Sequence, residues 1–251
     1  MLTIADVAKS YGTRELFSDV SLFVARTDRF GLVGPNGAGK TTLFNCLAGA
    51  LQPTSGQVKL DGRDITGASP DRVFAAGLAR TFQIPRPFPE MSVLDNVMLA
   101  PRSQLGERFW ANWLRPKAVA QQERAVQAAA RHWLDFVGLS ALAAEPARVL
   151  SGGQRKLLEL ARVMVAEPKL VLLDEPGAGV NPALLDQIVD RVAELNRQGV
   201  TFLVIEHNMD LVATLCHPVM VMAEGRLLMS GAAQTVLSDA RVVEAYLGSP
   251  A

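Results

Sequence analysis

The chain has 251 residues, of which 49% are hydrophobic, and 25 acidic residues balance 25 basic ones. This length allows one large domain with a subdomain or two small domains, and the apolar content excludes a disordered chain. The formal net charge of zero gives no electrostatic support to a protein that coats nucleic acid, so we expect no nucleic-acid partner. The two cysteines, Cys46 and Cys216, predict core residues in a reducing cytosol rather than a disulfide framework.

Neither candidate for a membrane or export segment has the necessary character. Residues 41–58 carry no formal charge, but Pro53 and Gly56 interrupt them and polar residues are frequent, so they are not expected to span a bilayer. The N-terminal "MLTIADVAKSYG" lacks the basic start and apolar core of a secretory signal. Any role at a membrane would therefore be exerted from the cytosolic side through a partner.

The first part of the chain predicts short strands, and the middle part predicts helices. Strands are expected at "LTIADVAKSYG", "SLFVAR", "RFGLVGP" and "SGQVKLDGRDI", the last with Asp-Gly as a turn signal. From about 92 to 166 the pattern is helical. Ser92 is the expected N-cap of one helix, and Pro116 begins a longer one that ends near Gly138.

After residue 168, apolar strands alternate with helices. The strands are "KLVLLDEP" and "VTFLVIEH", followed by the final pair "PVMVMAEG" and "RLLMSG". The intervening helices are "PALLDQIVDRVAELNRQG" and "NMDLVATLC". Strand–helix–strand units with wholly apolar strands predict a mostly parallel sheet covered on both faces. The fold class is therefore α/β, with a mostly helical insertion at about 90–165.

A glycine-rich loop between a predicted strand and a predicted helix fits the phosphate-binding motif G-x-x-x-x-G-K-[ST] in full. Such a loop directs backbone N–H groups at the β-phosphate of a nucleotide. Lys40 would bridge the β- and γ-phosphates, and the Thr41 hydroxyl would bind Mg²⁺. The alternative is an ordinary glycine turn that happens to precede a lysine. The expected ATP-binding residues here are Gly34, Pro35, Asn36, Gly37, Ala38, Gly39, Lys40, Thr41 and Thr42.

Two carboxylates follow the apolar run "LVLL". Asp174, at the carboxyl end of a parallel strand beside the P-loop, could hold Mg²⁺ directly or through water. Glu175 could accept a proton from an attacking water. A solvated acidic turn is the alternative. Together with the P-loop, the pair predicts a nucleoside triphosphatase.

A second anion site is predicted at "LSGGQ", residues 150–154. Ser151, Gly152 and Gly153 open a helix, whose first N–H groups have no helical partner and can receive a phosphate. Combined with the P-loop and "LLDE", this segment makes the whole chain resemble the ATP-binding-cassette (ABC) family. In that family, residues matching Ser151 to Gln154 bind the γ-phosphate of ATP held by another cassette.

The family resemblance implies a P-loop NTPase (RecA-like) core with a mostly parallel sheet, an N-terminal antiparallel β subdomain and a helical subdomain. It implies one ABC ATPase domain over residues 1–251, with the core and β subdomain at about 1–89 and 166–251 and the helical signature subdomain at about 90–165.

Four further residues match family positions one at a time. Tyr11 stands where family members stack an aromatic ring on adenine; the alternative is a tyrosine packed on the core. Gln83 resembles the glutamine that reaches Mg²⁺, the attacking water and the transporter partner, although a lone glutamine is usually a surface residue. His207 stands where a histidine contacts the γ-phosphate. Asn181 stands where the interface loop of the family commonly has an aspartate. The asparagine amide can still form hydrogen bonds, but it lacks the charge of the aspartate.

Several segments resemble a subgroup that imports branched-chain amino acids and similar solutes. They are "RTFQIPRPFPEMSVLDNVMLA", "LLDEPGAGVNP", "VIEHNMDLV" and "EAYLG". The resemblance implies ATP and Mg²⁺ as cofactors and an ATPase peripheral to the cytoplasmic face of the cell or inner membrane. Its partners would be transmembrane permeases, a second ATPase subunit (identical or sister) and, indirectly, an extracytoplasmic solute-binding protein. A lipid or lipopolysaccharide export ATPase and a non-transport cassette ATPase remain alternatives.

Overall fold

The structure is a computed structural model that describes residues 1–81, 85–101, 110, 113 and 115–247. The chain divides into two compact units, and we describe each by itself. The first unit comprises Met1–Gln83, Pro168–Ala178 and Val192–Ala251, and the second comprises Ile84–Glu167 and Gly179–Arg191. Gln83, a predicted site residue, lies outside the described residues.

An antiparallel sheet begins the first unit, in the order β2-β1-β4-β5. A turn at Gly12 and Thr13 joins β1 to β2, and the register pairs Leu2 with Val24 and Tyr11 with Arg14. Gly12 has the positive φ that this short turn requires, 59°. The antiparallel N-terminal sheet confirms that part of the expected fold. Its strands are β1 (Leu2–Tyr11), β2 (Arg14–Val24), β4 (Ser55–Leu60) and β5 (Arg63–Asp64).

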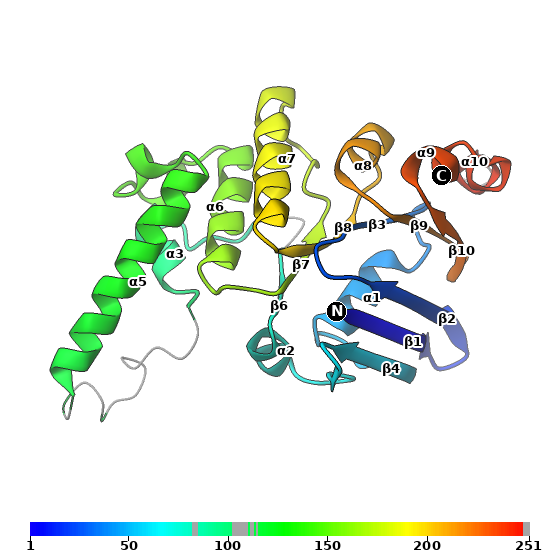
Figure 1. Cartoon of the computed structure of the whole chain (residues 1–251), viewed down its shortest axis with the longest axis horizontal. Helices are drawn as coiled ribbons and strands as arrows, with labels where there is room; N and C mark the ends of the chain where they lie inside the picture. Colours follow the sequence, from blue (N-terminus) through cyan, green and yellow to red (C-terminus); the bar gives the residue numbers. More distant parts are fainter. Residues whose placement is uncertain (82–84, 102–109, 111–112, 114, 248–251) are drawn as a thin grey trace. The chain divides into compact units, whose positions relative to one another are not determined.

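The second sheet of this unit has the order β10-β9-β3-β8-β7-β6 and is parallel except for β10 (Figure 1). Every residue of β7 and β8 is buried, as the uninterrupted apolar runs predict for strands covered on both faces. The predicted mostly parallel α/β sheet is confirmed. Its strands are β3 (Arg29–Val33), β6 (Leu78–Arg80), β7 (Leu170–Asp174), β8 (Thr201–Ile205), β9 (Val219–Ala223) and β10 (Arg226–Gly231).

Helix α1 and the two sheets share one hydrophobic core. Leu43 and Phe44 of α1 are fully buried in a cluster that also holds Leu2 and Phe17 of the antiparallel sheet and Leu203 of the parallel one. Each such side chain contributes about 1.5–3 kcal/mol when it is fully buried. This packing fixes α1, and with it the loop that precedes it. The helices confined to this unit are α1 (Lys40–Leu47), α2 (Pro70–Ala76), α8 (Met209–Leu215), α9 (Ala233–Leu237) and α10 (Ala240–Leu247).

The second unit is helical. The predicted helix from Pro116 is confirmed, and the chain turns at Gly138, where φ is +74°. Ser92 is the N-cap of α3 and accepts a hydrogen bond from the Asp95 N–H, also as predicted. Helix α7 begins in this unit and ends in the first. The described elements are α3 (Val93–Met98), α5 (Pro116–Phe136), the short 3₁₀ helices η2 (Ser140–Leu142) and η3 (Ala147–Val149), α6 (Gly152–Met164) and α7 (Pro182–Arg197).

Two further predictions concern the cysteines and the membrane. Cys46 and Cys216 are both buried, as expected of core residues, and both are free thiols. Within the part of the chain that the structure describes, no helix has both the length and the apolar character needed to cross a membrane.

Candidate active site

The glycine loop lies between the end of β3 and the start of α1. Gly37 and Gly39 have positive φ angles of 81° and 95°, which glycine adopts without strain. At Gly34, φ is 147°, and a Cβ atom would lie 1.9 Å from the backbone oxygen of Met222 in β9. The loop therefore curls tightly against the sheet while the first turn of α1 keeps N–H groups without helical partners.

Lys40 lies within this loop. Its Nζ donates hydrogen bonds to the backbone oxygens of Gly34, at 2.6 Å, and Pro35, at 2.8 Å. The side chain is buried, and burial lowers the pKa of Lys40, although the negative charge of Glu175 opposes that shift. An ammonium group held in this way is positioned to pair with a phosphate that enters the loop.

The glycine loop borders a cavity of about 920 Å³. Residues Pro35–Ala38, the β9–β10 turn and α10 line it, and Arg226 and Glu244 give it charges of both signs. This volume lies in the range of ligand sites, so the loop has open space on this side.

Asp174 ends β7 and is almost fully buried. Its Oδ2 accepts a hydrogen bond from Nη2 of Arg80 at 2.7 Å. Strand β8 lies between β7, which ends at Asp174, and β3, which leads into the P-loop. The strand order depends on long-range pairing, which the local pattern does not contain.

Glu175 follows with a left-handed backbone, φ +49°, and its N–H donates to the Ile205 oxygen at 2.9 Å. A left-handed residue other than glycine costs about 1–3 kcal/mol, and such strain persists only where the surrounding structure holds it. The turn brings Oε1 of Glu175 within 3.8 Å of Nδ1 of His207. The His207 side chain is 59% exposed, so its ring is accessible to a ligand. The structure thus gathers Lys40, Glu175 and His207 at the carboxyl ends of β3, β7 and β8.

The predicted second anion site begins α6 in the second unit. Ser151 and Gln154 form a reciprocal capping box: Ser151 Oγ accepts from the Gln154 N–H, and Gln154 Oε1 accepts from the Ser151 N–H. A Cβ on Gly153 would lie 1.9 Å from Leu184 Cδ2 of α7, so a larger residue there would require the Leu184 side chain to move. A Cβ on Gly152 would meet nothing within 4 Å. Packing within the chain therefore gives no reason for glycine at 152, where a ligand could approach the backbone.

Tyr11 and Asn181 have defined places. Tyr11 ends β1 with its side chain 54% exposed, so the alternative of a tyrosine packed in the core is wrong. Its ring lies under the Lys9 ammonium, with Nζ 4.8 Å from the ring centroid.

Asn181 Oδ1 accepts a hydrogen bond from the Leu184 N–H at 3.0 Å, at the start of α7. An amide oxygen caps this helix as a carboxylate would, so asparagine can replace the family's common aspartate at this position.

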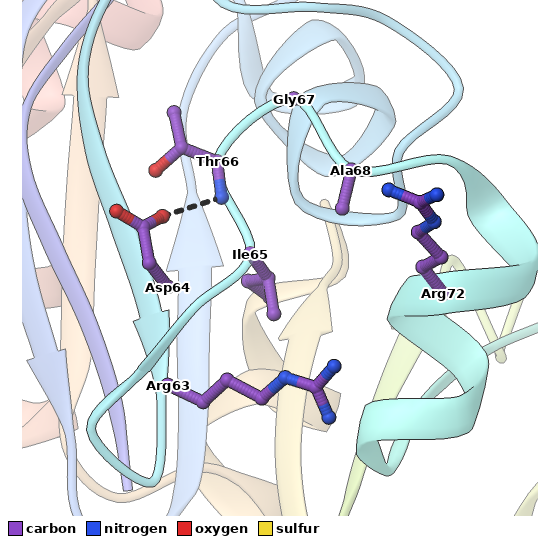
Figure 2. Close-up of a pocket in the computed structure, with 7 residues that line it drawn as sticks. All are labelled: Arg63, Asp64, Ile65, Thr66, Gly67, Ala68 and Arg72. Carbon is purple, nitrogen blue, oxygen red and sulfur yellow. Dashed lines mark hydrogen bonds between the residues drawn. The ribbon is translucent and has the colours of Figure 1, made fainter.

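A separate surface pocket lies between β5 and α2 (Figure 2). Arg63 and Arg72 line it, together with the intervening loop. The Thr66 N–H donates to Asp64 at 2.8 Å, and hydrogen bonds from Thr66 lower the pKa of Asp64. None of the predicted site residues lines this pocket, so it is not part of the candidate active site.

Comparison with known proteins identifies the family. A family model described as ABC transporter matches residues 17–178. The chain is 38% identical to the probable branched-chain amino acid transport ATP-binding protein LivG of Archaeoglobus fulgidus, over 99% of this chain and 96% of that protein. The chain belongs to the ABC transporter family. ABC cassettes are ATPases that bind ATP and ADP, and this chain is one of them.

Two further relatives match over the same extent. This cassette is 36% identical to the high-affinity branched-chain amino acid transport ATP-binding protein BraF of Pseudomonas aeruginosa, over 99% of this chain and 98% of that protein. A crystal structure of an ABC transporter cassette in its ADP conformation superposes with a TM-score of 0.85 at 36% identity, covering 99% of both chains. The expected family and fold class are confirmed.

The sequence patterns do not predict a role for two charged residues of this ABC cassette, Arg80 and Glu206. Arg80 ends β6 and links it to α1 and β7. It donates hydrogen bonds to Asn45 Oδ1 of α1, at 2.5 Å, and to Asp174 of β7. Its guanidinium group also lies over the Phe44 ring, 5.8 Å from the ring centroid. Glu206, directly after β8, is buried. One feature of the sequence could have indicated Glu206: it is a carboxylate at the end of a wholly apolar strand. No feature of the sequence indicates Arg80.

Proposed function

We propose that the chain is the ATP-hydrolysing subunit of an importer for branched-chain or other small amino acids. The observation that carries this proposal is the full-length similarity to proteins named for branched-chain amino acid transport. The gathering of Lys40, Glu175 and His207 around the glycine loop supports it, because these groups are those that phosphoryl transfer from ATP needs.

In this proposal, the loop from Gly34 to Thr42 cradles the phosphates, Lys40 pairs with the β- and γ-phosphates, and the exposed Tyr11 ring stacks on adenine. Glu175 orients or deprotonates the attacking water, and His207 contacts the γ-phosphate. The charge of Glu175 acts on Lys40, and Glu175 lies beside His207, so the three side chains can act on one phosphate.

Mg²⁺ fits the oxygen donors available here. Magnesium prefers carboxylate, hydroxyl and phosphate oxygens, and the site offers the Asp174 carboxylate and the Thr41 hydroxyl in the first turn of α1. Gln83 is the third proposed ligand. When bound, the ion would offset negative charge on the phosphate oxygens.

The helical unit would serve a neighbouring cassette. Ser151, Gly152 and Gly153 of one cassette would bind the γ-phosphate of ATP held by another, and the open space at Gly152 supports this approach. ADP lacks that phosphate, so only ATP favours the closed pair. A ligand shifts an equilibrium by its difference in affinity for the two states, and the γ-phosphate provides that difference.

We further propose that the chain works in a dimer of cassettes with permease partners; a cassette of known structure that is 27% identical to it is part of an ABC transporter complex. We propose that the dimer partner is a second copy or a sister ATPase, and that permeases hold the pair at the cytoplasmic face of the membrane. An extracytoplasmic solute-binding protein would deliver the amino acid to the permeases.

The Glu175→Gln variant tests the hydrolytic assignment. The amide cannot accept the water's proton, so we expect ATP binding to persist, turnover to fall by at least about 100-fold and an ATP-bound dimer to accumulate. Light scattering after size-exclusion chromatography, with and without ATP, measures the dimer. Lys40→Ala is the matched control, which should bind ATP weakly and stay monomeric. Turnover at the wild-type rate in Glu175→Gln would disprove the role of Glu175.

The imported solute requires the assembled transporter. With its permeases and binding protein in vesicles, ATPase activity should rise when leucine, isoleucine or valine is added. Stimulation by a lipid and by none of the amino acids would contradict import of amino acids.

A further inference from the structure

Glu206 joins two loops of the active site through one carboxylate. Its Oε2 accepts hydrogen bonds from the backbone N–H groups of His207, at 2.8 Å, and Asn208, at 3.1 Å. Its Oε1 accepts one from the N–H of Gly177 at 2.8 Å, 29 residues earlier in the chain. The side chain is 1% exposed, so these bonds are shielded from water.

Each of the two loops carries a residue of the proposed hydrolytic set. His207 is itself bonded to Glu206, and Gly177 lies two residues after Glu175. The Nδ1 atom of His207 lies 3.7 Å from Glu206 Oε2 and 3.8 Å from Glu175 Oε1. Movement of either loop would therefore change the spacing between Glu175 and the His207 ring.

The chemistry of the bonds favours a carboxylate over other side chains. An ionised carboxylate has two acceptor oxygens and no donor, so it can accept all three N–H groups at once. Glutamine has the same shape but one oxygen, and its NH₂ group would face an N–H of one loop or the other. Burial of a charged group is unfavourable unless hydrogen bonds compensate, as they do here.

We propose that Glu206 is a positioning residue for ATP hydrolysis, which holds His207 and the segment after Glu175 at the spacing that the reaction requires. The inference rests on the proposed roles of Glu175 and His207. Glu206 does not touch the nucleotide in this scheme, and it acts through the two loops.

The full-length Glu206→Gln variant tests the proposal, with Asp28→Asn as the matched control. Asp28 also accepts a backbone N–H, that of Ala25 at 2.7 Å, but it directly precedes β3, at the end of that strand away from the glycine loop. We expect kcat of Glu206→Gln to fall about tenfold or more while KM for ATP stays within about threefold, because loop spacing affects the transition state more than nucleotide binding. Asp28→Asn should keep the wild-type kcat. Wild-type kcat in Glu206→Gln would overturn the proposal.

A double-mutant cycle with His207→Ala separates positioning from general stability. If Glu206 acts through His207, adding Glu206→Gln to His207→Ala should lower kcat much less than it does alone. An equal factor in both backgrounds would overturn the proposed action of Glu206 through His207. Binding of a fluorescent ATP analogue checks that each variant is folded; should Glu206→Gln fail to bind, Glu206→Asp, which keeps both acceptor oxygens, replaces it under the same criteria.

The proposed roles of His207 and Glu206 can be disproved separately. If His207→Ala alone turns over like the wild type, the proposed role of His207 is wrong. If His207→Ala is impaired and Glu206→Gln is not, the positioning role of Glu206 alone is wrong.

Discussion

Individual glycines of the two segments that we propose bind phosphate meet different steric demands. Gly34 has both a positive φ and a backbone oxygen of β9 where a Cβ would be, so its glycine is required by the fold. Gly152 has neither constraint and occupies the first turn of α6. The same residue type therefore serves the chain's own packing in one segment and is free to serve a ligand in the other.

This difference predicts opposite results for two alanine substitutions. Gly34→Ala should destabilise the protein by about 3 kcal/mol or more, because the backbone of β9 cannot move away as a side chain could. Gly152→Ala should leave the free energy of unfolding within about 1 kcal/mol of the wild type, since alanine favours helices. Urea unfolding measures both. A Gly34→Ala protein as stable as Gly152→Ala would show that β9 does not constrain the loop.

Among the elements, the short strand β6 has a larger role than its three residues suggest. Arg80 links it to β7 through Asp174 and to α1 through Asn45. Both members of the ion pair are largely buried, with side chains 12% and 5% exposed. The arginine therefore connects the strand that carries Asp174 to the helix that carries Lys40.

Removal of Arg80 should be costly for that reason. Arg80→Ala leaves the Asp174 carboxylate buried without its cation, and breaking such a pair costs about 3–5 kcal/mol. Arg80→Lys should recover only part of this, because one ammonium does not reproduce the planar fork that reaches two acceptors. The exposed Arg197, which pairs with Glu194 on α7, gives the control: Arg197→Ala should change the free energy of unfolding by less than about 0.5 kcal/mol. Equal unfolding midpoints for the Arg80 and Arg197 variants would refute this assignment.

The elements also show which parts of the site could be predicted. The glycine loop, the Asp174–Glu175 pair and the start of α6 are local patterns, so the sequence predicts their positions at strand ends and helix starts. Arg80 and Glu206 act through bonds to residues 94 and 29 positions away, and β8 enters between β7 and β3 by long-range pairing. Such contacts arise only when the sheet is assembled, and no period or motif in the sequence encodes them.

At the scale of the whole molecule, we propose two anion-binding segments but only one hydrolytic set among the residues that the structure describes. The glycine loop, Glu175 and His207 belong to the first unit, and the α6 N-terminus belongs to the second. If each α6 N-terminus serves the ATP of another cassette, every composite site takes one half from each of two chains. A symmetric dimer then contains two such sites.

Complementation between two inactive variants tests this sharing. Lys40→Ala disables the phosphate loop, and Ser151→Arg blocks the α6 N-terminus with a bulky side chain, so each variant alone should be inactive. In a mixed dimer, one site receives both defects and the other receives none. An equimolar mixture should therefore regain turnover, up to about half of the wild-type value per subunit, since only mixed dimers hold ATP between their cassettes and one of their two sites is intact.

The concentration dependence supplies the control for that experiment. Wild-type turnover per subunit should rise with protein concentration as dimers form, and the mixture should follow the same curve at its lower plateau. If the wild type shows this rise and the mixture stays inactive at every concentration, the α6 N-terminus does not act on the partner's ATP. If Ser151→Arg alone is fully active, that segment has no part in hydrolysis, and the capping box between Ser151 and Gln154 is its only role.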